Sequence, residues 1–302
     1  MAQEEPVYQL LSPWGKRSLS HSPGLLRGMA QKESTQMKVI TFSIFKGGCG
    51  KTTSAVHTAY ALAQKRRRVL LIDMDQQASA TRYMNLDPDE TPSLYNVFTG
   101  NVQPATAIKR TDSGVDMLAS NVLMAAIEEA MEEGDEEKLT EIITPLKQRY
   151  HFILIDTPPG KAMLAFNGLV AADLIIVPAA AERMAVDGVA DLINHVQNIM
   201  WNRYRLDSQE IRILFTMYKA GTSHSPGVVA NARKIWRDNV LPIKIPEAIE
   251  FPRSFDRREP LNRYMPKHPG ALAYAALADW LVDYEKTTRR SFRSKTRRTR
   301  RH

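Results

Sequence analysis

The amino-acid sequence predicts an α/β protein with a doubly wound, mostly parallel twisted sheet flanked by helices. Short apolar and β-branched runs alternate with helical patterns along most of the 302 residues, as in folds whose parallel strands are joined by crossover helices. Three of these runs end in a glycine-rich turn or in aspartate, and open parallel sheets bind ligands at the carboxyl ends of their strands. The hydrophobic share of 43% is enough for the core of one large domain or two small ones.

Each expected element follows from a local pattern. Continuous apolar runs predict buried strands, and apolar residues spaced three and four apart predict amphipathic helices. The expected strands cover residues 39–44, 69–72, 115–119, 152–155, 174–177, 211–216 and 241–246. The expected helices cover residues 54–62, 94–98, 185–203, 226–237 and 270–284. A glutamate-rich helix pair is expected over residues 125–146, and its acids are expected to form a solvated face rather than a metal cage. These acids are Glu128, Glu129, Glu132, Glu133, Glu136 and Glu137.

The turn after the first strand, Phe45–Thr53 with the sequence FKGGCGKTT, has the composition of a phosphate-binding loop. Its glycines let the backbone turn tightly and direct N–H groups at an anion, and the following helix adds its positive end. These glycines are Gly47, Gly48 and Gly50. In this setting Lys51 contacts the β- and γ-phosphates, and the Thr52 hydroxyl holds Mg²⁺. The usual pattern G-x-x-x-x-G-K-[ST] would place its first glycine at Phe45, and here a second lysine, Lys46, opens the loop.

Aspartates follow two other buried runs. Asp73 and Asp75 end the run after the first helix, and Asp156 ends the run Phe152–Ile155. Because strand ends meet at one edge of a parallel sheet, we expect these carboxylates to lie near the glycine loop. An aspartate in the place of Asp156 commonly holds Mg²⁺ in enzymes that transfer phosphoryl groups.

These motifs resemble those of the ParA/MinD/Soj family of partition and positioning ATPases. The string K-G-G-x-G-K-T-T is similar to the family's deviant Walker A box, and Asp156-Thr157-Pro158-Pro159 matches its D-[CT]-P-P box. Residues 73–77 match its D-x-D-P-Q box except that Gln76 replaces the proline, which leaves the turn there in doubt. The resemblance extends over residues 37–285 and implies a P-loop NTPase fold.

The resemblance also implies a role for each motif residue. ATP and Mg²⁺ would be the cofactors, and the protein would form a homodimer in the ATP state, with Lys46 reaching the partner's phosphates and Asp75 positioning the attacking water. The implied catalytic residues are Lys46, Lys51 and Asp75, and the implied metal residues are Thr52, Asp73 and Asp156. The implied cofactor-binding residues are Lys46, Gly47, Gly48, Cys49, Gly50, Lys51, Thr52, Thr53, Ile245 and Pro246, of which the last two would line the adenine.

Positive charge is concentrated at the C-terminal end of the chain. The formal net charge is +8, yet residues 286–302 hold nine Lys or Arg and no acid, so the rest of the chain carries about −1. Gly221 and Glu250 stand where Soj-like relatives carry DNA-contacting arginines, so the tail is the preferred site for non-specific DNA. The expected DNA-binding residues are Lys219, Arg253, Arg289, Arg290, Arg293, Lys295, Arg297, Arg298, Arg300 and Arg301. The alternatives are a solubilising tail, anionic lipid headgroups, or a patch on the body that adds Arg233, Lys234, Arg237 and Lys244.

The predicted organisation is a flexible extension over 1–36, an ATPase domain over 37–285 and a basic disordered tail over 286–302. The sequence has no apolar run of the ~20 residues that a membrane span needs, and the acids near its start are not typical of a secretion signal. Cys49 is the one cysteine, so no disulfide can form within the chain. We therefore expect a cytoplasmic, nucleoid-associated protein. The predicted function is a dimerising ATPase that binds DNA and segregates or positions a plasmid, chromosome origin or other cargo through a ParB-like partner. The alternative is a MinD-like positioning ATPase on a membrane, which the tail's lack of an apolar face disfavours.

Overall fold

The computed structural model describes residues 37–182, 185–197 and 209–299. By its internal contacts the chain divides into two units, Met1–Ser34 and Thr35–His302, and every described residue belongs to the second. This unit is built on an eight-stranded sheet in the order β3-β4-β2-β5-β1-β6-β7-β8. All neighbouring strands are parallel except β3 and β4, which confirms the predicted fold class. The strands are β1 (Lys38–Phe42), β2 (Val69–Asp73), β3 (Ile108–Arg110), β4 (Asp116–Leu118), β5 (Phe152–Asp156), β6 (Leu174–Ala180), β7 (Glu210–Tyr218) and β8 (Val240–Pro246).

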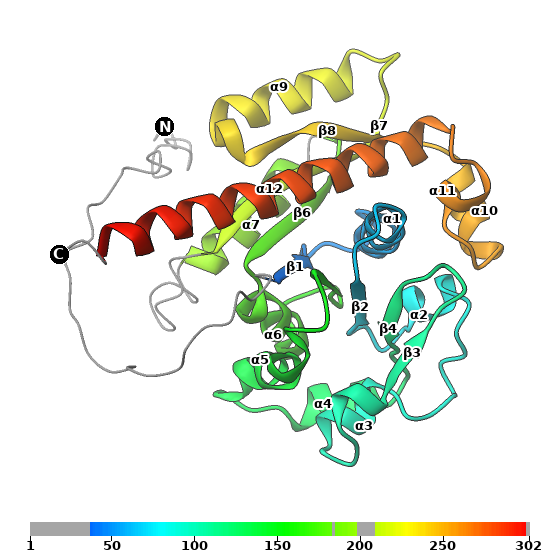
Figure 1. Ribbon diagram of the computed structural model, residues 1–302. Helices are drawn as coiled ribbons and strands as arrows, with labels where there is room; N and C mark the ends of the chain where they lie inside the picture. The colour runs from blue at the N-terminus through cyan, green and yellow to red at the C-terminus, as the bar shows by residue number, and fades with distance from the viewer. Residues whose placement is uncertain (1–36, 183–184, 198–208, 300–302) are drawn as a thin grey trace, which may run out of the picture. The chain divides into compact units, whose positions relative to one another are not determined.

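Helices cover both faces of the sheet. Figure 1 shows α1 and α12 lying side by side over one face, and their buried residues form one apolar cluster with β1, β2 and β5. The opposite face packs against α3 to α6 at one end and against α7 and α9 at the other. The helices are α1 (Lys51–Gln64), α2 (Ser79–Tyr83), α3 (Leu94–Phe98), α4 (Met124–Ala130), α5 (Lys138–Ile143), α6 (Met163–Ala171), α7 (Ala185–His195), α9 (His224–Trp236), α10 (Glu250–Asp256), α11 (Leu261–Tyr264) and α12 (Pro269–Thr299). Single 3-10 turns occupy Pro104–Thr106, Asp135–Glu137, Thr144–Leu146 and Arg237–Asn239.

The central strands are buried on both faces, which explains their continuous apolar sequences. In β1 the side chains of Ile40 and Phe42 join the cluster under α1 and α12, whereas Val39 joins the cluster on the other face. In β5 the same alternation sends Leu154 to the first cluster and Ile153 to the second. No helix in the described part of the chain is both long enough and apolar enough to span a bilayer.

The glutamate-rich segment differs from the prediction at two positions. Glu136 is buried and accepts a hydrogen bond from the Gly134 N–H at 2.8 Å. Glu128 accepts hydrogen bonds from the N–H groups of Met163 (2.5 Å) and Leu164 (2.9 Å). These two amides open α6 and have no partner within that helix, so Glu128 caps it. The prediction of one continuous solvated face is therefore wrong at Glu128 and Glu136.

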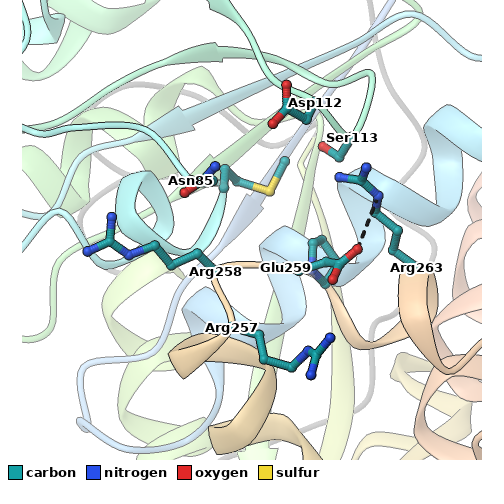
Figure 2. Close-up of a pocket in the computed structure, with 9 residues that line it drawn as sticks. Asn85, Asp112, Ser113, Arg257, Arg258, Glu259 and Arg263 are labelled. Atoms are coloured by element: carbon teal, nitrogen blue, oxygen red, sulfur yellow. Dashed lines mark ion pairs between the residues drawn. The ribbon is translucent and has the colours of Figure 1, made fainter.

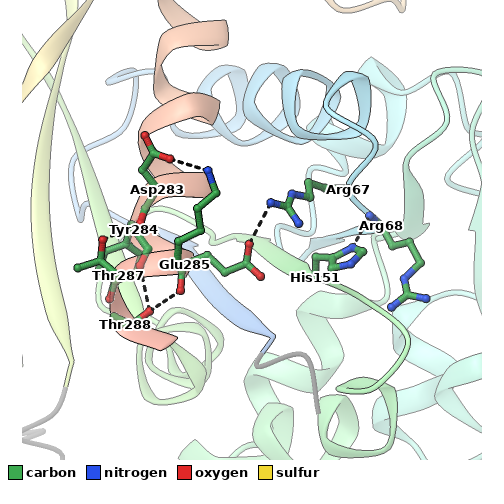
Figure 3. A network of polar contacts seen from close by, with 9 residues as sticks. Arg67, Arg68, His151, Asp283, Tyr284, Glu285, Thr287 and Thr288 are labelled. Atoms are coloured by element: carbon green, nitrogen blue, oxygen red, sulfur yellow. Dashed lines mark hydrogen bonds and ion pairs between the residues drawn. The ribbon is translucent and has the colours of Figure 1, made fainter. Parts of the chain in front are cut away.

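The last helix is longer than expected. The sequence predicts that this helix ends at Tyr284 and that a disordered tail begins at residue 286, but α12 remains helical to Thr299. No glycine or proline follows Gly270, and Lys and Arg are good helix formers, so no residue in this stretch ends the helix. Figure 3 shows how the helix is fastened before the basic stretch begins: the fully buried Glu285 forms an ion pair with Arg67 at 3.5 Å.

Candidate functional site

Three neighbouring strands bring the predicted motifs to one edge of the sheet. In the order β2-β5-β1, Asp156 lies level with Asp73 on one side and with Phe42 on the other. The chain leaves β1 at Phe42 and enters the glycine loop three residues later, at Phe45. The Thr157 hydroxyl donates a hydrogen bond to the Phe42 carbonyl at 3.0 Å and ties the ends of β1 and β5 together. The loop and the two aspartates therefore meet although up to 111 residues separate them.

The glycine loop has the backbone that its sequence predicts. Gly48 (φ 72°) and Gly50 (φ 81°) are left-handed, a conformation that glycine adopts without strain. Gly50 is also the residue directly before α1, whose first N–H groups remain available for an anion. The Thr216 hydroxyl of β7 donates a hydrogen bond to the Cys49 carbonyl at 2.9 Å and holds the loop against the sheet. Lys51 begins the helix and is buried.

Asp73 and Asp156 form a buried acidic pair. The Asp73 carboxylate accepts hydrogen bonds from the Thr81 N–H and hydroxyl (2.9 and 2.8 Å) and from the Asp75 N–H (3.2 Å). Burial nevertheless raises its pKa from 3.8 to about 6. Burial, and after it the charge of Asp73, raises the pKa of Asp156 well above its ordinary value.

Asp156 differs from Asp73 because neither of its carboxylate oxygens has a hydrogen-bond partner among the described residues. Thr52 and Lys51 lie close enough to lower its pKa, yet their effect is smaller than that of burial. A fully buried carboxylate without a partner carries a large desolvation cost, which a bound cation would offset. Groups of three or more His, Cys, Asp or Glu able to enclose a metal are absent from the described residues. A cation held by Asp156 and Thr52 would therefore retain positions for water and phosphate oxygens, as Mg²⁺ sites usually do.

Asp75 is the accessible acid of the site. It is half-buried and lines the cavity described below, whereas Asp73 and Asp156 lie beneath it. Its carboxylate accepts a hydrogen bond from the Gln77 N–H at 2.9 Å, and its carbonyl accepts one from the Ser120 hydroxyl at 2.7 Å. Gln76, which replaces the expected proline, is exposed.

A cavity of about 760 Å³ opens over the loop and extends to α10 and α12. The predicted residues that line it are Gly47, Gly48, Gly50, Lys51, Thr52, Thr53, Asp75, Ile245 and Pro246. Its aromatic wall was not among the features predicted from the sequence, and it is formed by Tyr83, Phe251, Phe255 and Tyr274. These rings come from α2, α10 and α12, and no local motif marks them, because each has the sequence context of an ordinary core residue.

A buried histidine packs behind this wall. The His57 ring stacks on Tyr274 with centroids 5.0 Å apart, and it contacts Tyr83 and Phe251 edge-on. Its Nδ1 lies 2.7 Å from the Thr53 carbonyl, and its Nε2 accepts the Leu261 N–H at 3.1 Å. Burial lowers the pKa of His57 to about 4, so the ring is neutral at physiological pH and both nitrogens are satisfied. His57 thereby fixes the start of α1 to the start of α11.

Other predicted residues lie outside the cavity. Lys46 is exposed and is not among the residues that line it. Cys49 is buried and its thiol contacts the Gly47 carbonyl at 3.6 Å. Of the predicted DNA-binding residues on the body, Lys219 forms an ion pair with Glu247 at 3.0 Å, and Arg253 is exposed on α10. Arg300 and Arg301 lie outside the described residues, and only the backbone is described for Arg289, Arg290, Arg293, Lys295, Arg297 and Arg298.

Comparisons with known proteins agree with this geometry. The AAA domain family model AAA_31 matches residues 37–208. The sporulation initiation inhibitor protein Soj of Bacillus subtilis is 30% identical over 245 residues, which cover 80% of this chain and 96% of Soj. The cobyrinic acid a,c-diamide synthase of Mycobacterium smegmatis with bound ADP and magnesium superposes with a TM-score of 0.71 at 31% identity, covering 83% of this chain and 96% of that one. The septum site-determining protein MinD of Pyrococcus horikoshii, complexed with Mg-ADP, gives 0.68 at 25% identity, covering 81% and 96%.

Proposed function

The chain belongs to the ParA/Soj/MinD family of P-loop ATPases, and on this premise we propose that it is a dimerising ATPase that binds DNA without sequence preference and segregates or positions a cargo. The cargo would be a plasmid, a chromosome origin or another body held by a ParB-like partner, and the protein would act in the cytoplasm on the nucleoid. One observation carries the nucleotide chemistry: the buried, unpartnered Asp156 carboxylate beside Lys51 and the glycine loop.

The residues of the site fit ATP and magnesium. The loop amides from Gly47 to Thr53 and the Lys51 ammonium would hold the phosphates, and Ile245 with Pro246 would contact the adenine. Thr52 and Asp156 would hold magnesium, with Asp73 behind them. When bound, the metal supplies positive charge that neutralises the phosphate oxygens.

Hydrolysis requires a water molecule placed in line with the γ-phosphate. Asp75 suits this role because it is the one of the three neighbouring aspartates that lines the cavity. Its carboxylate would accept a hydrogen bond from the water and orient the oxygen toward the γ-phosphorus. As the new P–O bond forms, the bond from the γ-phosphorus to the bridging oxygen breaks, and ADP leaves with that electron pair while the water proton passes to phosphate.

Dimerisation would use Lys46. Its side chain is exposed at the opening of the loop rather than turned into the cavity of its own subunit, so it is available to a partner's phosphates. A charge supplied in trans stabilises the transferring phosphoryl group only in the assembled dimer. ATP binding and dimer formation would therefore depend on each other.

DNA binding would use the basic end of α12. Lys286, Arg289, Arg290, Arg293 and Arg297 recur at three- and four-residue intervals, and the backbone is helical throughout this stretch. Residues at this spacing share one face of a helix. A basic face on a helix of this length suits phosphate contacts along a duplex, and dimerisation would double the number of such helices on one DNA.

The body patch is the weaker candidate for DNA. Lys219 is already paired with Glu247, and the Lys244 ammonium lies 4.9 Å from the centre of the Tyr218 ring. Gly221 and Glu250 add no positive charge, and Glu250 itself contacts His268 at 3.5 Å. Anionic lipid headgroups would also attract the basic helix, so vesicle binding is the outcome that would favour the membrane alternative.

The deciding experiment compares Asp75→Ala, Lys46→Ala and, as a matched control, Lys147→Ala, an exposed lysine that is not among the residues lining the nucleotide cavity. Asp75→Ala should bind ATP and dimerise but lose turnover. Lys46→Ala should bind ATP yet remain monomeric in size-exclusion chromatography with a slowly hydrolysed analogue. Normal ATP turnover in Asp75→Ala, or a stable dimer of Lys46→Ala, would contradict the roles assigned to these residues.

A further inference from the structure

A second cavity, of about 240 Å³, shares no lining residue with the nucleotide cavity. Figure 2 shows that its walls come from three parts of the chain: the residues after α2, the turn between β3 and β4, and the segment that runs from the end of α10 into α11. Three of the residues that line it are arginines within seven positions of one another, namely Arg257, Arg258 and Arg263. None of them belongs to the sets predicted from the motifs.

The arginines of this cavity are only partly neutralised. The Arg263 Nε lies 3.2 Å from Glu259 Oε1, which orients that guanidinium and leaves its terminal N–H groups available. The Arg257 guanidinium lies 4.5 Å from the centre of the Tyr264 ring, a contact that supports its planar face without occupying its donors. Within the described part of the chain, Arg258 has no ion pair. The remaining carboxylate, Asp112, is exposed on the opposite rim from Arg257 (Figure 2).

The backbone at Arg258 is strained. Its φ is 52°, the left-handed conformation in which a helix end ordinarily places glycine. The Arg258 N–H donates to the Phe255 carbonyl at 2.9 Å, and the next N–H, that of Glu259, donates to the Ser254 carbonyl at 3.1 Å. The position therefore ends α10, and a glycine there would end it with less strain. An arginine in this place adds a third arginine to the cavity wall at a cost in backbone energy.

We propose that this cavity binds a phosphate group. Guanidinium forks match phosphate oxygens in geometry and charge, and the three arginines that line this cavity outnumber its two carboxylates, Glu259 and Asp112. The volume is below the roughly 300–1,000 Å³ of pockets that enclose a whole small molecule, so the occupant is one phosphate rather than a second nucleotide. Its source is either the backbone of DNA or a free phosphorylated compound. A neighbouring cavity of about 400 Å³ shares Arg257 and adds Arg253, but Glu250 and Asp256 also line it, so it adds no net positive charge.

The test uses two arginines with the same backbone conformation. Arg258→Gly removes one guanidinium from the cavity, and Arg66→Gly removes an exposed arginine with φ 57° at the end of α1, so charge and backbone change equally. Both are made in full-length Lys51→Ala protein to suppress phosphate binding at the glycine loop. Each is titrated with inorganic phosphate and, separately, with a short DNA duplex at constant ionic strength. Arg258→Gly should weaken binding about tenfold or more, as expected for a lost charge-assisted hydrogen bond, and Arg66→Gly should not.

The two titrations also identify the source of the phosphate. A loss confined to DNA assigns the site to the nucleic-acid backbone, and a loss for inorganic phosphate assigns it to a free compound. Equal affinities of the Arg258→Gly and Arg66→Gly proteins in both titrations would overturn the proposal. The melting temperature of the Arg258→Gly protein should be no lower than that of the Lys51→Ala parent, because glycine relieves the backbone strain. If it is lower, Arg257→Gln serves as the second variant, with the same expected loss of binding. The two cavities share no lining residue, so ATP hydrolysis by Arg258→Gly protein that keeps Lys51 tests the proposed function independently.

Discussion

Replacing the unpartnered carboxylate with an amide, Asp156→Asn, should stabilise the nucleotide-free protein while abolishing its response to magnesium. The scale comes from Asp73, whose pKa rises from 3.8 to about 6 on folding. That rise corresponds to ~3 kcal/mol of stability lost when the group ionises. Asp156 is also fully buried, and burial together with the charge of Asp73 raises its pKa, so its ionisation should likewise be unfavourable in the folded protein.

The pH dependence gives the sign of the effect. The pKa values of Asp73 and Asp156 in the folded protein lie above the unfolded value of 3.8. The free energy of unfolding is therefore unaffected by these two groups below pH 3.8, and it falls as the pH rises through their folded pKa values. Asparagine cannot ionise, so the advantage of Asp156→Asn should be near zero at acid pH and should rise with pH, on the order of 3 kcal/mol at pH 8 as for other uncompensated buried charges. In a domain of this size this corresponds to roughly 6 °C in melting temperature.

The assay is urea unfolding of the wild type and Asp156→Asn from acid to alkaline pH, with EDTA present. The matched control is Asp191→Asn, which neutralises an exposed aspartate on α7 and should show no such trend. Adding magnesium and a slowly hydrolysed ATP analogue should stabilise the wild type by ~3 kcal/mol at a hundred times the dissociation constant, and should leave Asp156→Asn nearly unchanged. A variant less stable than the wild type at pH 8, or an advantage that is the same at every pH, would refute the reasoning.

Two further predictions concern the ends of helices. Deleting residues 286–302 removes the basic face of α12 but keeps the Arg67–Glu285 ion pair, so folding should be preserved. If half of the nine cations contact phosphate, the logarithm of the affinity for DNA should fall with the logarithm of the salt concentration at a slope of roughly −4. The deletion should make this slope shallower. An unchanged slope would assign DNA binding to the body of the protein. Glu128→Ala should lower the free energy of unfolding, measured in urea, by about 1–2 kcal/mol because two α6 amides lose their acceptor. Glu129 is exposed on α4, the helix that also carries Glu128, and Glu129→Ala should lower the same quantity by less than ~0.5 kcal/mol.

The part of the site that the sequence could predict lies at the ends of strands. Asp73 and Asp156 end apolar runs, and the glycine loop follows another, so their chemistry and their place at one sheet edge follow from local pattern. Their adjacency required the strand order, which places β5 between β1 and β2 although β3 and β4 precede it in the chain. The role of Glu128 was missed for a related reason: its partners at Met163 and Leu164 are 35 and 36 residues away, and a surface glutamate looks the same in sequence whether or not it caps another helix.

The aromatic wall of the cavity shows where local pattern stops being informative. Tyr83 and Tyr274 are 191 positions apart, yet both pack on His57, and the Tyr274 hydroxyl lies 3.1 Å from the Ser54 hydroxyl in the first turn of α1. In the sequence each of these residues looks like part of the buried face of a helix, and each is buried. They belong to the site because α1, against which they pack, begins at the phosphate loop. The rings that shape the cavity are thus held by the same helix whose N-terminus would receive the phosphates. A change in the packing around His57 would therefore alter the position of the phosphate loop, although neither the sequence context of His57 nor its neutral charge state marks it as functional.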